Sequence, residues 1–164
     1  MRVVLIPGLM GGSGTLSCLK EKILSAGHTC YSPGFSTFTL LNNELNVLQR
    51  TIRELSPVVL VGHSAGSLLG LLLSLTDNSR IIGLIGMGTP MMGFMRPRMP
   101  YYEARSIVGK FLPLWGPNEI RYFNTTHASL PCNSGVQAWV IEKLQQIDEG
   151  FDKHDKVWYH GGSK

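Results

Sequence analysis

The chain has 164 residues, of which 43% are apolar and 16% are charged, and its formal net charge is +4. This length suits one domain with a sizeable core, and the apolar fraction excludes a disordered chain. The longest apolar runs, at 3–6, 58–61 and 68–73, are far shorter than the roughly 20 residues of a membrane-spanning helix. Lysines and arginines are spread without an aromatic-interleaved basic stripe, which excludes a nucleic-acid binder and leaves only weak attraction to an anionic membrane surface.

The N-terminal apolar run ends at Pro7 and is too short for the core of a signal peptide, so a cytoplasmic location is expected. Three widely spaced cysteines fit a reducing compartment, and no C-x-x-C pair indicates a zinc or redox site. We therefore expect no metal and no cofactor.

The first half of the chain alternates strand-like and helix-like segments. A β-branched run predicts a buried strand at 2–6, and a glycine-rich turn follows at 8–14. Apolar residues at helical spacing predict a helix over 16–27, followed by a short strand at 29–32. Apolar positions that step by four and three predict an amphipathic helix over 41–55.

The second half continues this alternation. Strands are expected at 58–61, 81–85 and 120–123, and helices at 65–75 and 136–147, whereas residues 91–117 show no regular pattern. Buried strands that alternate with helices predict one three-layer α/β domain, with a mostly parallel sheet and helices on both faces. This domain spans 1–150, and a polar, loosely held tail covers 151–164.

Residues 62–66 read G-H-S-A-G and lie between a predicted strand and a predicted helix. A tight strand–turn–helix exposes the central serine, here Ser64, and demands small residues two positions away on each side. Gly62 and Gly66 meet that demand. At the start of the helix, the backbone N–H of Ala65 can stabilise an oxyanion. The alternative is that Ser64 only caps the helix.

A serine hydroxyl needs a neighbouring imidazole to take its proton. His127 follows the predicted strand 120–123 and precedes the last helix, so it lies in a loop at the carboxyl end of a strand. His63 is fixed beside Ser64 and is assigned to packing, while His28 begins a strand and lies at the wrong end of the sheet. The remaining two histidines, at 154 and 160, are in the tail. The alternative for His127 is a solvent-exposed loop histidine.

The glycine-rich segment 5–12 is expected to supply the second donor of the oxyanion hole. Glycines let the backbone approach a substrate, and the N–H of Leu9, or failing that of Met10, is the candidate. A phosphate-binding loop is excluded because no Lys-Ser/Thr pair follows and the glycines do not fit G-x-G-x-x-G.

Four segments together resemble the family of small microbial α/β-hydrolase lipases and esterases. They read I-P-G-L-M-G-G at 6–12, V-G-H-S-A-G at 61–66, G-T-P at 88–90 and T-H-A-S-L-P at 126–131, in the family's order. The resemblance spans residues 3 to about 148. It implies a minimal α/β-hydrolase fold, Ser64 as nucleophile, His127 as base, and a carboxylic ester or thioester substrate.

The chain departs from this family at the acid of the triad. The family places a carboxylate after a strand between the G-T-P segment and the histidine, and the sequence shows neither such a strand nor a Gly-x-Asp. Asp77 and Glu119 are expected at the far end of the sheet, which leaves Glu103 as the candidate. Otherwise a backbone carbonyl, a water or a polar side chain orients His127, or the chain is an inactive relative.

Four of the seven methionines fall within 91–99, so 91–117 is either a cap or lid over Ser64 or the filling of a core gap. The expected function is a serine hydrolase that cleaves a small-molecule or lipid-like ester through an acyl-serine intermediate. A thioesterase or acyltransferase with the same nucleophile, and a non-catalytic binding protein of the same fold, remain alternatives.

Overall fold

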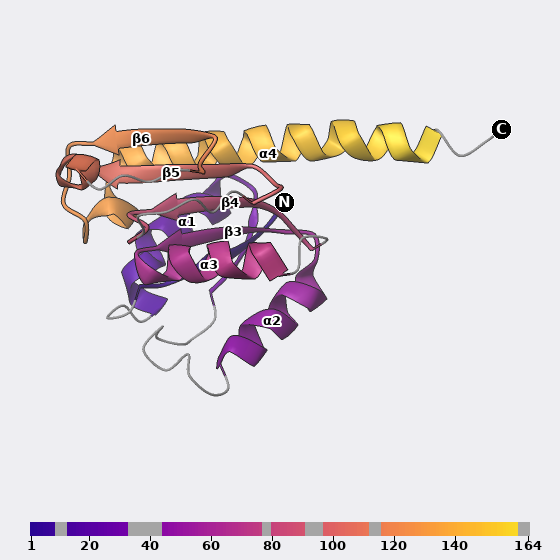
Figure 1. Cartoon of the computed structure of the whole chain (residues 1–164), viewed down its shortest axis with the longest axis horizontal. Helices are drawn as coiled ribbons and strands as arrows, with labels where there is room; N and C mark the ends of the chain where they lie inside the picture. The colour runs from indigo at the N-terminus through magenta and orange to yellow at the C-terminus, as the bar shows by residue number, and fades with distance from the viewer. Residues whose placement is uncertain (9–12, 33–43, 77–79, 91–96, 112–115, 161–164) are drawn as a thin grey trace.

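The computed structural model describes residues 1–8, 13–32, 44–76, 80–90, 97–111 and 116–160. Six strands form one sheet in the order β2-β1-β3-β4-β5-β6, and every neighbouring pair is parallel (Figure 1). The strands are β1 (Arg2–Ile6), β2 (Thr29–Tyr31), β3 (Val58–His63), β4 (Ile81–Met87), β5 (Tyr101–Ser106) and β6 (Glu119–Phe123). All six residues of β3 are buried, as its continuous apolar sequence predicts for a central parallel strand.

Helices cover both faces of this sheet, which confirms the predicted three-layer architecture (Figure 1). Helices α1 (Ser17–Ser25) and α4 (Ser134–His160) pack on one face, and α2 (Glu44–Leu55) and α3 (Ala65–Thr76) pack on the other. Three short 3-10 helices complete the described elements: η1 (Ser13–Leu16), η3 (Ile107–Phe111) and η4 (Leu130–Cys132). Within the described ranges, no helix has both the length and the apolar character that crossing a membrane requires.

The largest difference from the sequence prediction is β5, which lies inside the segment expected to be irregular. Tyr101 is fully buried, as are Glu103 and Ala104, so this part of 91–117 belongs to the sheet and not to a lid. The prediction failed because a buried parallel strand is normally a continuous apolar run, whereas β5 carries Glu103 and Arg105. The rest of 91–117 includes η3, whose Ile107 and Val108 are exposed, and the stretches 91–96 and 112–115, which lie outside the described residues, so a lid over Ser64 stays a prediction.

The C-terminal segment also differs from its prediction as a loose tail. Helix α4 continues without a break to His160 and extends beyond the sheet (Figure 1). Gly150 does not stop it, because a single glycine costs a helix only about 1 kcal/mol and no proline follows.

The structure joins Cys18 of α1 to Cys132 of η4 in a disulfide and leaves Cys30 free. This corrects the reading of all three cysteines as thiols of a reducing compartment. Spacing could not reveal the pair, because the two residues are 114 positions apart and meet only when α1 packs beside η4. The cytoplasmic location stays a prediction.

Candidate active site

The turn between β3 and α3 holds Ser64 in a left-handed backbone conformation, with φ of 53°. Among described residues other than glycine, Ser64 alone has a positive φ, and such a conformation costs a side-chain-bearing residue about 1–2 kcal/mol. The turn is this tight because the helix follows the strand at once. A Cβ on Gly66 would overlap the carbonyl of Ile6, and one on Gly62 would meet the backbone of Ser67 at 2.5 Å. The sequence G-H-S-A-G is therefore what this turn requires.

Ser64 is held at the carboxyl edge of the sheet by its neighbours. Its backbone N–H donates to the carbonyl of Met87, the last residue of β4, at 2.8 Å. The end of β1 reaches the same place, since a Cβ on Gly8 would lie 3.2 Å from the Cβ of Ser64. Ala65 is the first residue of α3, so its N–H belongs to the turn that has no acceptor inside the helix. Leu9 and Met10 lie outside the described residues.

His127 lies in the loop between β6 and η4, as predicted, and is exposed. Its ring packs against Gly88, where β4 ends. Gly88 has a φ of +69°, and a Cβ there would come within 2.6 Å of both Cε1 and Nδ1 of the His127 ring. A side chain at position 88 would therefore push the His127 imidazole out of this place, and only glycine leaves room for it. Because Ser64 is bonded to Met87, the same strand end contacts both predicted catalytic residues.

His63, assigned to packing from the sequence, contacts the base loop directly. Its Nε2 lies 2.9 Å from the carbonyl oxygen of His127, and the two imidazole rings are 5.0 Å apart between centroids. The side chain is 9% exposed, and burial is the largest cause that lowers the pKa of His63. The hydrogen bond to the His127 carbonyl acts in the opposite direction, and the charge of the His127 imidazolium again lowers the pKa.

Five residues therefore converge at one edge of the sheet: Gly8, His63, Ser64, Gly88 and His127. Within the described parts of the chain, no hydrogen bond joins Ser64 to the His127 ring. Such bonds are often long in a free enzyme and shorten when substrate binds. The arrangement places the Ser64 hydroxyl on a strained turn and an exposed imidazole at the same edge of the sheet.

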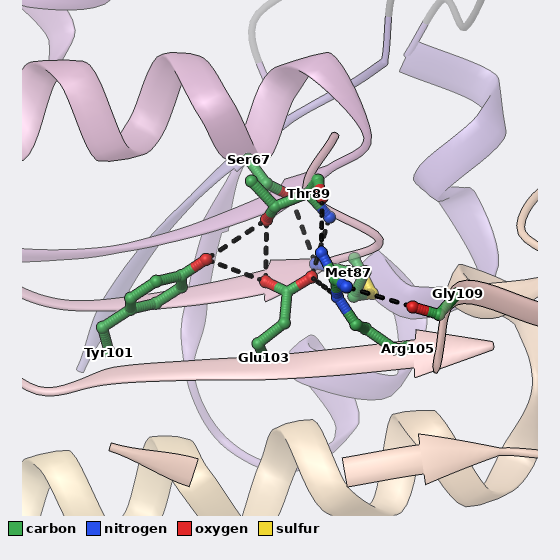
Figure 2. Close-up of polar contacts among 7 residues, drawn as sticks. All are labelled: Ser67, Met87, Thr89, Tyr101, Glu103, Arg105 and Gly109. Atoms are coloured by element: carbon green, nitrogen blue, oxygen red, sulfur yellow. Dashed lines mark hydrogen bonds and ion pairs between the residues drawn. The ribbon is translucent and has the colours of Figure 1, made fainter. Parts of the chain in front are cut away.

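Glu103, the predicted candidate for the acid, belongs to a different cluster (Figure 2). One carboxylate oxygen accepts the backbone N–H of Thr89 at 2.7 Å, and the other is bonded to the Thr89 hydroxyl at 2.7 Å and the Tyr101 hydroxyl at 3.0 Å. Nε of Arg105 lies 3.7 Å from the first oxygen, and its guanidinium also donates to the carbonyls of Thr89 and Gly109. Both oxygens of Glu103 are thus used inside the fold.

The structure does not bring Glu103 to His127, so the expectation that it serves as the acid is wrong. Glu103 leaves β5 on the side covered by α3, as Figure 2 shows. His127 lies against Gly88 together with Leu130, which belongs to the core on the α1 and α4 side. Burial raises the pKa of Glu103, opposed by hydrogen bonds from Thr89 and Tyr101 and by the charge of Arg105.

The other acids considered from the sequence do not fill the place either. Glu119 begins β6 and binds Trp139 at 3.0 Å and Lys143 at 2.6 Å, and the hydrogen bond from Lys143 is the largest cause that lowers the pKa of Glu119. Asp77 lies outside the described residues. Sequence reasoning also missed Thr89, Tyr101 and Arg105 as partners of Glu103. The signal was the alternation of 101, 103 and 105, which places them on one face once a strand is recognised.

No family model matches the sequence, and no curated protein matches it. The similarity appears in three dimensions. A methylesterase from Arabidopsis superposes with a TM-score of 0.71 at 13% identity, over 88% of this chain and 99% of that one. A methylketone synthase from tomato, solved with 2-tridecanone, gives 0.70 at 12% identity, over 91% and 98%. The α/β hydrolase domain-containing protein 10 from mouse gives 0.68 at 11% identity, over 92% and 90%.

Two of these proteins are named for different activities and the mouse protein for its domain alone, so the likeness concerns the framework that carries the site. Six parallel strands in this order, covered by helices on both faces and matched over most of each chain, identify that framework. The chain has the α/β-hydrolase fold.

Proposed function

We propose that this chain is a serine hydrolase that cleaves a carboxylic ester through an acyl-Ser64 intermediate. The observation that carries the proposal is the left-handed Ser64 at a turn so tight that Gly62 and Gly66 tolerate no side chain. A serine that merely capped α3 would need neither this conformation nor these contacts.

The reaction follows from the groups at this edge. Oγ of Ser64 attacks the ester carbonyl carbon while His127 takes its proton, and the carbonyl electrons form an oxyanion. The N–H groups of Ala65 and Leu9 hold that oxyanion. The ester C–O bond then breaks, and the alcohol leaves with the proton from His127. A water next attacks the acyl group, passes its proton through His127 to Ser64, and releases the acid.

The substrate is proposed to be a small-molecule or lipid-like ester with an apolar acyl part. The methionine-rich stretch 91–99 supports this preference, because flexible thioethers adapt to irregular apolar partners. The tomato protein of the same fold was solved with 2-tridecanone, whose alkyl chain has the same character. A thioesterase or acyltransferase uses the same steps with a different leaving group or acceptor.

The test is a chain-length series of p-nitrophenyl esters and matched thioesters, with wild type, Ser64→Ala, His127→Ala and Glu103→Gln. We expect kcat/KM to fall by at least about 10³-fold in the Ser64 and His127 variants. Glu103→Gln keeps an oxygen acceptor for Thr89 and should remain within about threefold, because its carboxylate does not reach the base. Hydrolysis that survives Ser64→Ala would refute the proposal.

One observation favours a second candidate, a non-catalytic binding protein. Among the described residues, the His127 ring has no carboxylate partner, and a triad without its acid is slower by about 10⁴-fold in a well-studied protease. For that candidate, no ester or thioester in the series is turned over faster by wild type than by Ser64→Ala.

A further inference from the structure

His63 occupies a position that neither packing nor nucleophilic chemistry explains. It is the last residue of β3, its side chain is buried, and a titratable group at that place costs desolvation free energy. An apolar side chain would fill the space without this cost. The imidazole instead points at the backbone of the loop that carries the proposed base.

The contact defines which nitrogen of His63 carries the proton. A carbonyl oxygen only accepts hydrogen bonds, so Nε2 must be the donor to the carbonyl of His127. In the neutral ring Nδ1 is then unprotonated, and it faces Gly8, with 3.5 Å to the position a Cβ would take there. Burial favours this neutral ring by lowering the pKa of His63.

This hydrogen bond is also the link between the base loop and the strand that carries the nucleophile. The other described hydrogen bonds of 124–129 stay local: they join Thr126 to Ser129 and connect the loop to its flanks at 123, 130, 132 and 133. His63, by contrast, is adjacent to Ser64 in the backbone. A hydrogen bond from the His63 ring to His127 therefore links the loop of the proposed base to the residue next to the proposed nucleophile.

We propose that His63 is a positioning residue for His127, whose Nε2–H holds the His127 carbonyl and thereby fixes the base relative to Ser64. It takes over part of the orienting role that a carboxylate has in a complete triad. The ring of His127 rests against Gly88, so the base is held by its carbonyl on one side and by its ring on the other. This inference rests on the proposed function of Ser64 and His127.

The test compares His63→Leu, which removes the donor, with His63→Gln, whose side-chain amide can still donate to the carbonyl. His28→Gln is the matched control, because His28 lies before β2 at the opposite end of the sheet. With a p-nitrophenyl butyrate substrate, we expect kcat of His63→Leu to fall about 10- to 100-fold while KM changes less than about twofold. His63→Gln should recover at least about a third of wild-type kcat, and His28→Gln should match wild type.

A second measurement does not depend on turnover. Long-range ¹H–¹⁵N NMR of the wild-type protein at pH 8 should show His63 as the Nε2–H tautomer. The opposite tautomer would overturn the inference even if the enzyme is active, and so would a His63→Leu kcat equal to that of wild type. If wild type hydrolyses no ester, the proposed function fails and this inference falls with it, whichever tautomer is found. Should His63→Leu not fold, the tautomer still decides.

Discussion

Two polar regions, one at the end of β3 and one within β5, hold their polar side chains in opposite ways. At the end of β3, Ser64 is half-buried and held in a left-handed conformation, beside an exposed His127. In β5, Glu103 is fully buried and bonded to three neighbouring side chains. In the first region a strained backbone leaves the Ser64 hydroxyl free of a described hydrogen bond to His127. In the second region both carboxylate oxygens of Glu103 are bonded inside the fold. A carboxylate near a proposed active site is thus not an acid of that site unless it reaches the base.

The largest expected effect comes from breaking the Glu103 cluster. Glu103→Ala removes the carboxylate that lies beside the buried guanidinium of Arg105 and binds Thr89 and Tyr101, and we expect a loss of about 3–5 kcal/mol in the free energy of unfolding. The double variant Glu103→Leu with Arg105→Met removes both charges and should lie within about 2 kcal/mol of wild type. Urea unfolding measures both. Equal losses in the single and double variants would show that the ion pair is not what holds this region.

A smaller effect is expected from Gly86, which lies between the two regions. A Cβ there would overlap Oε2 of Glu103, so Gly86→Ala should cost about 1–3 kcal/mol by displacing the carboxylate from Thr89. In the Glu103→Ala background this cost should shrink but not vanish, because the added Cβ still lies 2.7 Å from the Thr89 hydroxyl. Gly14→Ala is the matched control, because nothing lies within 4 Å of its added Cβ. An undiminished cost without Glu103 would mean that the carboxylate is not what rejects the side chain.

His63 should make the free energy of unfolding depend on pH. Because burial lowers the pKa of His63 in the folded protein, the unfolded chain binds a proton near pH 6.5 that the folded chain does not. The free energy of unfolding should therefore fall as the pH drops below 6.5, by up to about 1.4 kcal/mol per pH unit, until the folded pKa is reached. His63→Gln should lose less stability than wild type between pH 8 and pH 5.5. Parallel curves for the two proteins would contradict this sign.

The smallest expected effect is the relief of strain at Ser64. Glycine accepts a φ of 53° without the steric cost that alanine has, but its unfolded chain is more flexible. Ser64→Gly should therefore be more stable than Ser64→Ala by about 0.5–1 kcal/mol, measured by thermal and urea unfolding of the two variants. Greater stability of the alanine variant would mean that the turn relaxes in solution.

Most of the framework could be predicted from the sequence, because strands such as 58–61 are continuous apolar runs and helices such as 44–55 keep a clear apolar spacing. The strand β5 could not be predicted. Its inward residues Glu103 and Arg105 are charged and find their partners only in three dimensions, so their burial leaves no apolar run in the sequence. The disulfide could not be predicted from the sequence either, because only packing brings Cys18 and Cys132 together.

The site divides in the same way. Ser64 and its flanking glycines follow from local geometry, which a five-residue pattern between a strand and a helix records. The loop position of His127 follows from chain order. The contact of His63 with the His127 carbonyl joins residues 64 positions apart, and no local pattern encodes which way that imidazole points.

The most direct test of the account is covalent labelling by a fluorophosphonate probe, followed by intact mass and peptide mapping. The account predicts one adduct per chain, located on Ser64, absent in Ser64→Ala and formed much more slowly in His127→Ala. Absence of an adduct on the wild-type protein, or an adduct that persists in Ser64→Ala, would contradict the assignment of Ser64 as the nucleophile.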